Sequence, residues 1–240
     1  MRYDDATYEN PTALVGLPSI GLVGSILSSF IVREMSMSVI AGITSPDLPP
    51  YCMIQGGTPY PPIRIYGCTR DKTDETGGDL VIVTSEIAPK PEQCYALAVA
   101  IMGVLRDLGV SMAICLEGVP SYEGGDSMVA CGSSKRMHDE IDRLGLRNLG
   151  EGLVRGTTGI MLYEGAHSGM DVMSILCPAN PALPDPRAAA RLLEPLSKIL
   201  PELKMDVNPL YKEAEDIDLR MKSQEAYANR ENTDLRQLYG

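Results

Sequence analysis

Two acidic side chains stand where α/β enzymes often carry out proton transfer. Glu86 follows the apolar segment 80–84, and Glu117 follows the apolar segment 112–116. Both segments are typical of strands that are buried on both faces of a sheet. Because the carboxyl ends of parallel strands meet at one edge, we expect both carboxyl groups at that edge, where ligands of α/β proteins gather. Paired carboxylates there could act as a general acid and a general base.

The other residue types that a catalytic centre needs do not accompany these carboxyl groups. The two histidines, His138 and His167, are far apart in the sequence and are each expected on a helix surface, so they form no metal-binding pair. The chain contains no Gly-x-Ser-x-Gly nucleophile motif. We therefore expect no catalytic residue, no metal ion and no cofactor, and we predict that the protein is not an enzyme.

The glycine-rich segment Gly16–Gly24 connects a predicted strand to a predicted helix, a place where backbone amides often hold a phosphate. Its glycine spacing does not match G-x-G-x-x-G, and no lysine follows as in a P-loop. Pro18 also removes a backbone N–H that an anion would use. The segment therefore favours a tight turn with close helix-to-sheet packing. The alternative is a ligand loop, whose candidate residues are Gly16, Ser19, Gly21, Gly24 and Glu86.

The last three residues combine groups that suit docking into another protein. Leu238 can fill a small apolar pocket, Tyr239 offers a large amphipathic ring, and the Gly240 carboxylate can pair with a lysine. A flexible stem would let several tails of one assembly bind together, which raises avidity. This composition produces such an ending by chance in about 2% of chains, so the motif gains weight only from the rest of the sequence.

Strand-like and helix-like segments alternate along the chain and predict an α/β fold. The expected strands are 13–15, 39–43, 51–55, 63–67, 80–84, 112–116, 128–131 and 172–176. The expected helices are 19–35, 91–108, 134–144, 159–167 and 185–200, with Ser19, Ser134 and Asp185 as N-caps. The polar segment 70–78 has little to bury and is expected to be a mobile loop.

The composition changes after Pro201, and we expect a boundary between residues 207 and 208. Residues 1–207 form the α/β body, and residues 208–240 form a charged helix that projects from it and a flexible docking tail. A thin apolar seam on this helix consists of Leu210, Ala214, Ile217 and Met221. Such a seam is stable only against a partner, often another copy, so we expect a homo-oligomer.

The composition also limits the kinds of binding partner and the cellular compartment that we expect. A net charge of -11 argues against nucleic acid and anionic membranes, because both attract clustered Lys and Arg. The uncharged stretch Pro11–Val32 has nearly the length of a membrane span, but its Gly, Pro and Ser residues indicate a strand, a turn and a helix. The six cysteines form no C-x-x-C pair and are expected to be small buried hydrophobes in a reducing cytoplasm.

Seven short segments have a specific order and spacing. They are Gly16–Gly24, Ser45–Pro50, Pro62–Gly67, Asp79–Glu86, Gly118–Pro120, Gly156–Gly159 and Pro184–Ala189. Together they resemble the archaeal members of the proteasome assembly chaperone family, over about residues 12–221. The resemblance implies a three-layer αβα fold with a mostly parallel or mixed sheet, similar to the nucleoside phosphorylase architecture but without its activity.

The resemblance also implies homo-oligomers that bind α subunits of the proteasome core particle. The family's C-terminal hydrophobic-Tyr-X motif is matched by Leu238, Tyr239 and Gly240. In proteasome partners this motif inserts between adjacent α subunits, where a lysine meets the carboxylate. We therefore expect a non-enzymatic assembly chaperone or activator. The alternative hypothesis is a phosphorylase- or nucleosidase-like enzyme that uses the Gly16–Gly24 turn and Glu86.

Overall fold

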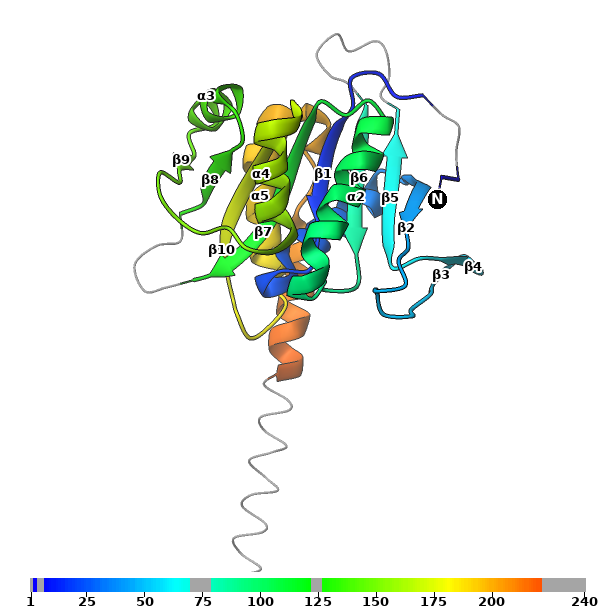
Figure 1. The fold of residues 1–240 in the computed structure, drawn as a ribbon. Coiled ribbons are helices and arrows are strands. Elements are labelled where there is room, and N and C mark those ends of the chain that lie inside the picture. Colours follow the sequence, from blue (N-terminus) through cyan, green and yellow to red (C-terminus); the bar gives the residue numbers. More distant parts are fainter. Residues whose placement is uncertain (1, 4–6, 70–78, 122–126, 222–240) are drawn as a thin grey trace, which may run out of the picture.

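A mixed eight-stranded sheet runs through the centre of the computed structural model (Figure 1). The structure describes the chain except residues 1, 4–6, 70–78, 122–126 and 222–240, so the predicted loop 70–78 lies outside it. The strands are β1 (Thr12–Gly16), β2 (Ser38–Ile43), β5 (Ile63–Cys68), β6 (Leu80–Ser85), β7 (Met112–Pro120), β8 (Val129–Gly132), β9 (Arg147–Asn148) and β10 (Asp171–Ala179). Their order is β2-β5-β6-β1-β7-β10-β8-β9. A separate hairpin consists of β3 (Met53–Gln55) and β4 (Thr58–Tyr60).

The four central strands β6, β1, β7 and β10 run parallel to one another. Antiparallel pairs flank them, since β5 pairs with β6, β2 with β5, and β8 with β10. Strand β1 lies in the middle, with Leu14 opposite Ile82 on one side and Ile114 on the other. A short strand with parallel neighbours on both sides is buried on both faces, which explains the apolar run Ala13–Val15 at its centre. The prediction was a mostly parallel or mixed sheet, and the structure shows the mixed one.

Helices cover both faces of the sheet and complete the predicted three-layer fold (Figure 1). Helices α1 (Val23–Glu34) and α5 (Pro186–Ile199) pack on one face, and α2 (Cys94–Asp107) and α4 (Gly156–Ser168) on the other. Successive strand residues point to opposite faces, so Leu14 packs in the α1 and α5 layer while Ala13 and Val15 pack in the α2 and α4 layer. Helix α3 (Lys135–Leu144) packs beside β8.

Two of the three predicted N-caps are confirmed. The Ser134 hydroxyl accepts from the Met137 N–H at 3.3 Å, and the Asp185 carboxylate accepts from the Ala188 N–H at 2.9 Å. The predicted helix-capping role of Ser19 is wrong. Its hydroxyl makes no capping hydrogen bond and instead accepts from the Gly118 N–H at 2.9 Å. Ser19 therefore joins the β1–α1 turn to strand β7.

Helix α1 begins later than predicted. A short 3-10 turn, Ile20–Leu22, precedes it, with Gly21 at φ 62° and Leu22 at φ 52°. Further 3-10 turns occur at Pro91–Gln93 before α2 and at Pro201–Leu203 after α5. Each of these turns adjusts the direction in which the chain enters or leaves a helix.

Residues 208–221 form a further helix whose first part packs on the body of the chain. Leu210 and Ala214 are only 1% and 2% exposed, and Leu210 belongs to the same apolar cluster as α1 and α5. The Arg187 Nη2 atom lies 2.9 Å from Asp218 Oδ2 and ties this helix to α5. The expectation that the seam requires another chain is therefore wrong for its first half, which the chain buries itself. The helix then extends beyond the lower end of the body in Figure 1.

The cysteines and histidines agree in part with the sequence analysis. All six cysteines are free thiols, and Cys94, Cys115 and Cys177 are buried, but Cys52 is exposed and corrects the expectation that all are internal. Both histidines lie on exposed helix surfaces, as predicted. Within the described ranges, no His, Cys, Asp and Glu side chains group as metal ligands. The described helices include none long and apolar enough to cross a membrane.

Candidate functional site

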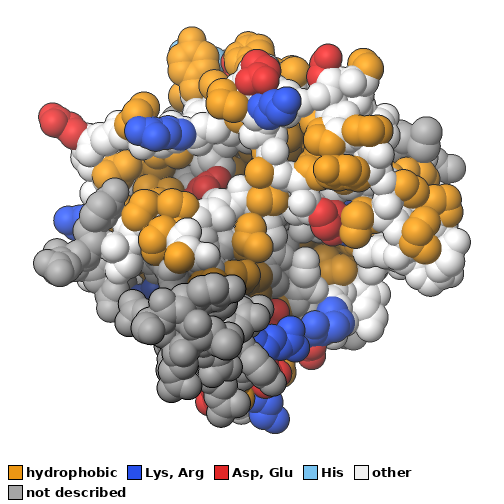
Figure 2. All heavy atoms as spheres, turned by 90° about the horizontal axis from the view of Figure 1, so that it is seen from below, with side chains coloured by type: hydrophobic (Ala, Val, Ile, Leu, Met, Phe, Trp, Pro, Cys, Tyr) orange, Lys and Arg blue, Asp and Glu red, His pale blue; other side chains and the backbone are white. Residues whose placement is uncertain are grey.

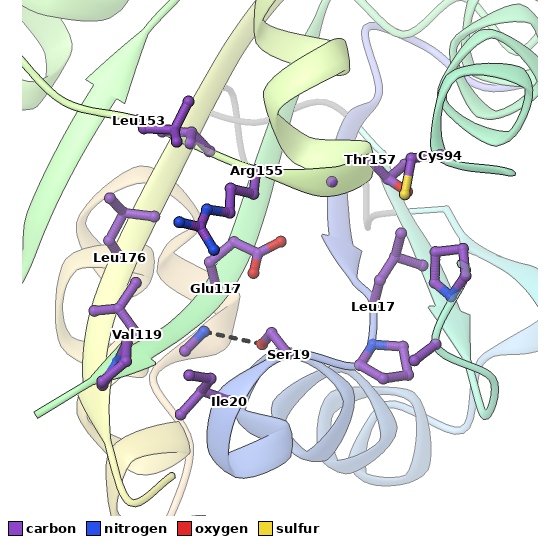
Figure 3. A pocket seen from close by; sticks show the side chains of 17 residues that line it. Leu17, Ser19, Ile20, Cys94, Glu117, Val119, Leu153, Arg155, Thr157 and Leu176 are labelled. Atoms are coloured by element: carbon purple, nitrogen blue, oxygen red, sulfur yellow. Dashed lines mark hydrogen bonds between the residues drawn. The ribbon is translucent and has the colours of Figure 1, made fainter. Parts of the chain in front are cut away.

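A cavity of about 530 Å³ opens at the carboxyl end of the central strands. The β1–α1 turn, the segment after β6, the end of β7 and the start of α4 form its walls (Figure 3). Apolar side chains make up most of the lining, and they include Leu17, Ile20, Val119, Leu153 and Leu176. Figure 2 views the molecule from this end, where hydrophobic side chains occupy much of the surface. The cavity has the size and lining of a site for a small organic molecule.

Glu117 of β7 is the acidic side chain of this cavity. Thr158 of α4 donates a hydrogen bond from its hydroxyl to the Glu117 carboxylate. Burial raises the pKa of Glu117 to about 7, and the Thr158 hydrogen bond only partly opposes this effect. A carboxyl group with such a pKa is a mixture of acid and carboxylate at neutral pH.

The basic side chain of the cavity is Arg155, which directly precedes α4. In Figure 3 its guanidinium lies between the side chains of Glu117 and Leu176, which also line the cavity. Gly156 follows at φ 69°, a backbone conformation that favours glycine, and it turns the chain into the helix. Arg155 is a cavity residue that the sequence alone does not identify. The only signal near it is the segment Gly156–Gly159, which carries the family resemblance and no chemistry of its own.

Glu86 does not share this cavity with Glu117, so the predicted pair of carboxylates is not assembled. Glu86 follows β6 and Glu117 lies within β7, which continues to Pro120, and β1 lies between these two strands. Glu86 turns instead toward the antiparallel edge, where its Oε2 atom accepts from Arg64 Nη1 at 2.9 Å. Arg64 also donates to the Tyr66 hydroxyl at 2.8 Å. The Glu86 carboxylate is therefore engaged by a buried guanidinium at the edge of the sheet, away from the cavity.

The glycines of the predicted ligand loop have packing roles. A Cβ atom at Gly16 would overlap the Ser28 hydroxyl and the Gly24 carbonyl, and one at Gly24 would overlap the Leu116 carbonyl of β7. Gly21 needs its positive φ and lies against Ala179. The first interpretation, a tight turn with close helix-to-sheet packing, therefore describes this segment. Of the five candidate residues of the ligand-loop alternative, Ser19 is the one that lines the cavity.

The third predicted site, Leu238, Tyr239 and Gly240, lies outside the described residues. Figure 1 shows the helix 208–221 directed away from the body at the end toward which the central strands run. The helix 208–221 therefore extends from the body at the same end as the cavity.

Comparisons with known proteins place this fold among related chains. A crystal structure of PbaA from Pyrococcus furiosus, described as an archaeal homolog of proteasome-assembly chaperone, is 28% identical and has a TM-score of 0.81. The alignment covers 98% of this chain and 95% of PbaA. PbaB of the same organism, described as an archaeal proteasome activator, has a TM-score of 0.79 at 21% identity, over 94% of this chain and 97% of PbaB.

A comparison of sequences adds a relative from a second organism. An uncharacterized protein of Methanocaldococcus jannaschii is 27% identical over 219 residues, which are 90% of this chain and 85% of that protein. Residues 13–225 match the PAC2 family. This match includes every helix and strand from β2 to the helix 208–221, and it agrees with the resemblance found from the short segments. The chain belongs to the PAC2 family.

Proposed function

We propose that this chain is a non-enzymatic proteasome assembly chaperone or activator that binds α subunits of the proteasome core particle. The observation that carries the proposal is the likeness to PbaA along 98% of the chain, together with the family match. The arrangement of the acidic residues also favours binding over catalysis. Glu86 is engaged by Arg64 and lies apart from Glu117, so the two carboxyl groups do not form the acid and base pair that an enzyme would use.

The docking element of the proposal is the C-terminal motif Leu238, Tyr239 and Gly240. In this proposal Leu238 and the Tyr239 ring enter a pocket between two α subunits, and the Gly240 carboxylate pairs with a lysine there. The helix 208–221 supports this role, because it is anchored by Leu210 and then leads the chain away from the body. A tail that starts from an anchored helix can reach a partner without disturbing the fold.

A pull-down against purified proteasome core particles tests the docking motif. The full chain should capture the core particle, whereas deletion of residues 238–240 and the Tyr239→Ala variant should each lose capture. Tyr211→Ala is a matched control, because it removes an exposed tyrosine from the anchored helix and leaves the tail intact. Equal capture by the truncated and full-length chains would overturn the proposed mode of binding.

The same proposal includes a homo-oligomer that works in the cytoplasm. The second half of the seam, Ile217 and Met221, is half-buried in the single chain and is available for further packing. Light scattering coupled to size exclusion gives the number of copies, and removal of residues 208–240 should reduce it. Several tails in one assembly would raise the avidity for a ring of α subunits.

The alternative of a phosphorylase- or nucleosidase-like enzyme has less support. Its proposed phosphate loop, Gly16–Gly24, uses its glycines for close packing, and its proposed acid, Glu86, is held by Arg64. Calorimetry with phosphate and with a nucleoside distinguishes the two proposals. Saturable heat that is lost in Glu86→Gln would favour the enzyme.

A further inference from the structure

The outer side of the layer formed by α2 and α4 carries very little charge. The two helices lie side by side on one face of the sheet (Figure 1). Helix α2 has no charged residue from Cys94 to Leu105, and α4 contains Glu164 as its one Asp, Glu, Lys or Arg residue. The Glu164 carboxylate accepts from the Tyr95 hydroxyl of α2 at 3.1 Å. A helix that is apolar on all sides is normally buried on all sides, but the outer side of α2 is not covered by the chain itself.

Large apolar side chains are exposed on this layer. Tyr95 and Val99 of α2 are 56% and 45% exposed, and Tyr163 of α4 is 61% exposed. Tyr95, Ala96, Val99 and Gly103 recur at spacings of three and four, so they lie along one stripe of α2. We call this stripe together with Tyr163 the α2–α4 face. Contiguous apolar surface of this kind is typical of a site where another protein binds.

Gly103 gives an independent indication that another helix packs here. It lies in the interior of α2, it is only partly buried, and a Cβ atom at this position would meet nothing within 4 Å. Alanine is the more favourable residue in a helix interior, so the single chain gives no reason for a glycine. A glycine does allow the backbone of a second helix to come close.

The charges at the two ends of the stripe restrict the partner. Glu92 lies about one turn before Ala96, and Arg106 lies about one turn after Gly103. Both side chains are exposed, and neither takes part in an ion pair within the described ranges. Two α2 helices that pack antiparallel would place Glu92 of each copy against Arg106 of the other, whereas a parallel pair would oppose like charges. The stripe is therefore complementary to itself in the antiparallel direction.

The net charge of the chain also favours this face for contact between copies. Two chains that each carry a charge of -11 repel each other. Copies can therefore meet best where charge is absent or pairs with its opposite, and the α2–α4 face meets both conditions. Val99 lies seven residues from Glu92 and seven from Arg106, so it marks the midpoint of the stripe.

We propose that the α2–α4 face is the contact between two copies of this chain, related by a two-fold axis that passes near Val99 with the α2 helices antiparallel. The proposal rests on the homo-oligomer of the proposed function and specifies its interface. It does not depend on the docking motif. The helix 208–221 packs with α1 and α5 on the other face of the sheet, so a pair formed through α2 leaves that helix uncovered.

Charge reversal in the full-length chain tests the proposal. Glu92→Arg and Arg106→Glu should each weaken self-association by about ten-fold or more, because each change replaces two attractive pairs by two repulsive pairs across the axis. An equimolar mixture of the two variants should restore association, since the arginines of one variant then face the glutamates of the other. Analytical ultracentrifugation over a range of concentrations gives the dissociation constants.

Controls separate this contact from effects of net charge and of folding. Glu151→Arg and Arg147→Glu make the same changes in net charge at exposed positions near β9, and they should leave association unchanged. Val99→Glu should abolish association, because it places two acids together at the axis. Gly103→Gln should weaken association, although the single chain has room for the side chain. Circular dichroism of each variant checks that the fold is kept.

Three outcomes would overturn the assignment. In the first, the unmodified chain stays monomeric at every concentration. In the second, Val99→Glu and both charge reversals associate as the unmodified chain does, which places the contact on another surface. In the third, the mixture of Glu92→Arg and Arg106→Glu stays dissociated, which excludes the antiparallel pair.

The core-particle pull-down separates this proposal from the docking motif. Deletion of residues 238–240 should leave self-association unchanged, and Val99→Glu should still capture the core particle, with lower avidity. If Val99→Glu instead lost capture and kept its self-association, the α2–α4 face would belong to the core particle and not to a second copy.

Discussion

The guanidinium of Arg64 and the carboxylate of Glu86 face each other across the antiparallel strands β5 and β6. Arg64 is buried, at 3% exposure, and its Nη1 atom lies 2.9 Å from Glu86 Oε2. This pair explains why an acid at the carboxyl end of a central strand does not reach the cavity beside it. It also makes the stability of this sheet edge depend on Glu86.

Glu86→Gln should destabilise the fold, because it leaves the charge of Arg64 buried beside a neutral group. The Glu86 side chain is 35% exposed, so we expect a loss of about 2 kcal/mol in the free energy of unfolding, less than for a fully buried pair. Urea denaturation of the variant and the unmodified chain measures this loss in the free energy of unfolding. Glu34→Gln, which breaks the exposed pair with Arg33, is the control and should cost less than about 0.5 kcal/mol. Equal losses in both variants would contradict a structural role for the Arg64–Glu86 pair.

Gly24→Ala should be strongly destabilising, because the added Cβ atom overlaps the Leu116 carbonyl of β7. We expect a loss of about 3 kcal/mol, since neither backbone can move without disturbing the sheet. Gly103→Ala is the matched control in α2, where a Cβ atom meets nothing within 4 Å. It should stabilise the protein by up to about 1 kcal/mol, as an alanine does within a helix. A tolerated Gly24→Ala would reopen the ligand-loop interpretation of this segment.

The raised pKa of Glu117 makes stability depend on pH. Its pKa is about 7 in the folded chain and 4.5 when unperturbed, so between these values the folded state holds a proton that the unfolded state releases. The stabilisation from this group is complete below about pH 4.5 and is lost as the pH rises through 7. The whole effect is about 3 kcal/mol.

Urea denaturation at several pH values, compared with Glu117→Gln, isolates this contribution. The variant keeps an acceptor for Thr158 but cannot ionise, so it should be more stable than the unmodified chain at pH 8 and similar at pH 5. Parallel pH profiles for the two proteins would show that Glu117 titrates normally.

Leu210→Ala should cost about 2 to 4 kcal/mol, because Leu210 is 1% exposed in the cluster that also holds α1 and α5. Leu219→Ala, on the same helix but 61% exposed, should change the free energy of unfolding by less than about 0.5 kcal/mol. Thermal or urea unfolding of both variants gives the comparison. If Leu210→Ala were as mild as Leu219→Ala, the helix 208–221 would be independent of the body.

Local patterns were sufficient for most of the secondary structure. Apolar runs located the strands β6 and β7, and the N-caps Ser134 and Asp185 marked the starts of α3 and α5, because capping depends on residues three positions apart. Ser19 had the same local signal, but its hydroxyl bonds Gly118, which is 99 residues away. A contact of this kind depends on which strands become neighbours, and a local pattern carries no such information.

The sequence by itself determined the alternation of strands and helices, which follows from periodicity. The order of seven short segments determined the resemblance to the family, and that resemblance implied the three-layer fold. Only the tertiary structure decided which polar groups meet. It separated Glu86 from Glu117 by placing β1 between their strands, it brought Arg155 to the cavity that Glu117 lines, and it brought the Thr158 hydroxyl within hydrogen-bond distance of Glu117. The reason is physical: strand order and helix packing set the distances between residues remote in sequence, and burial then sets their charges.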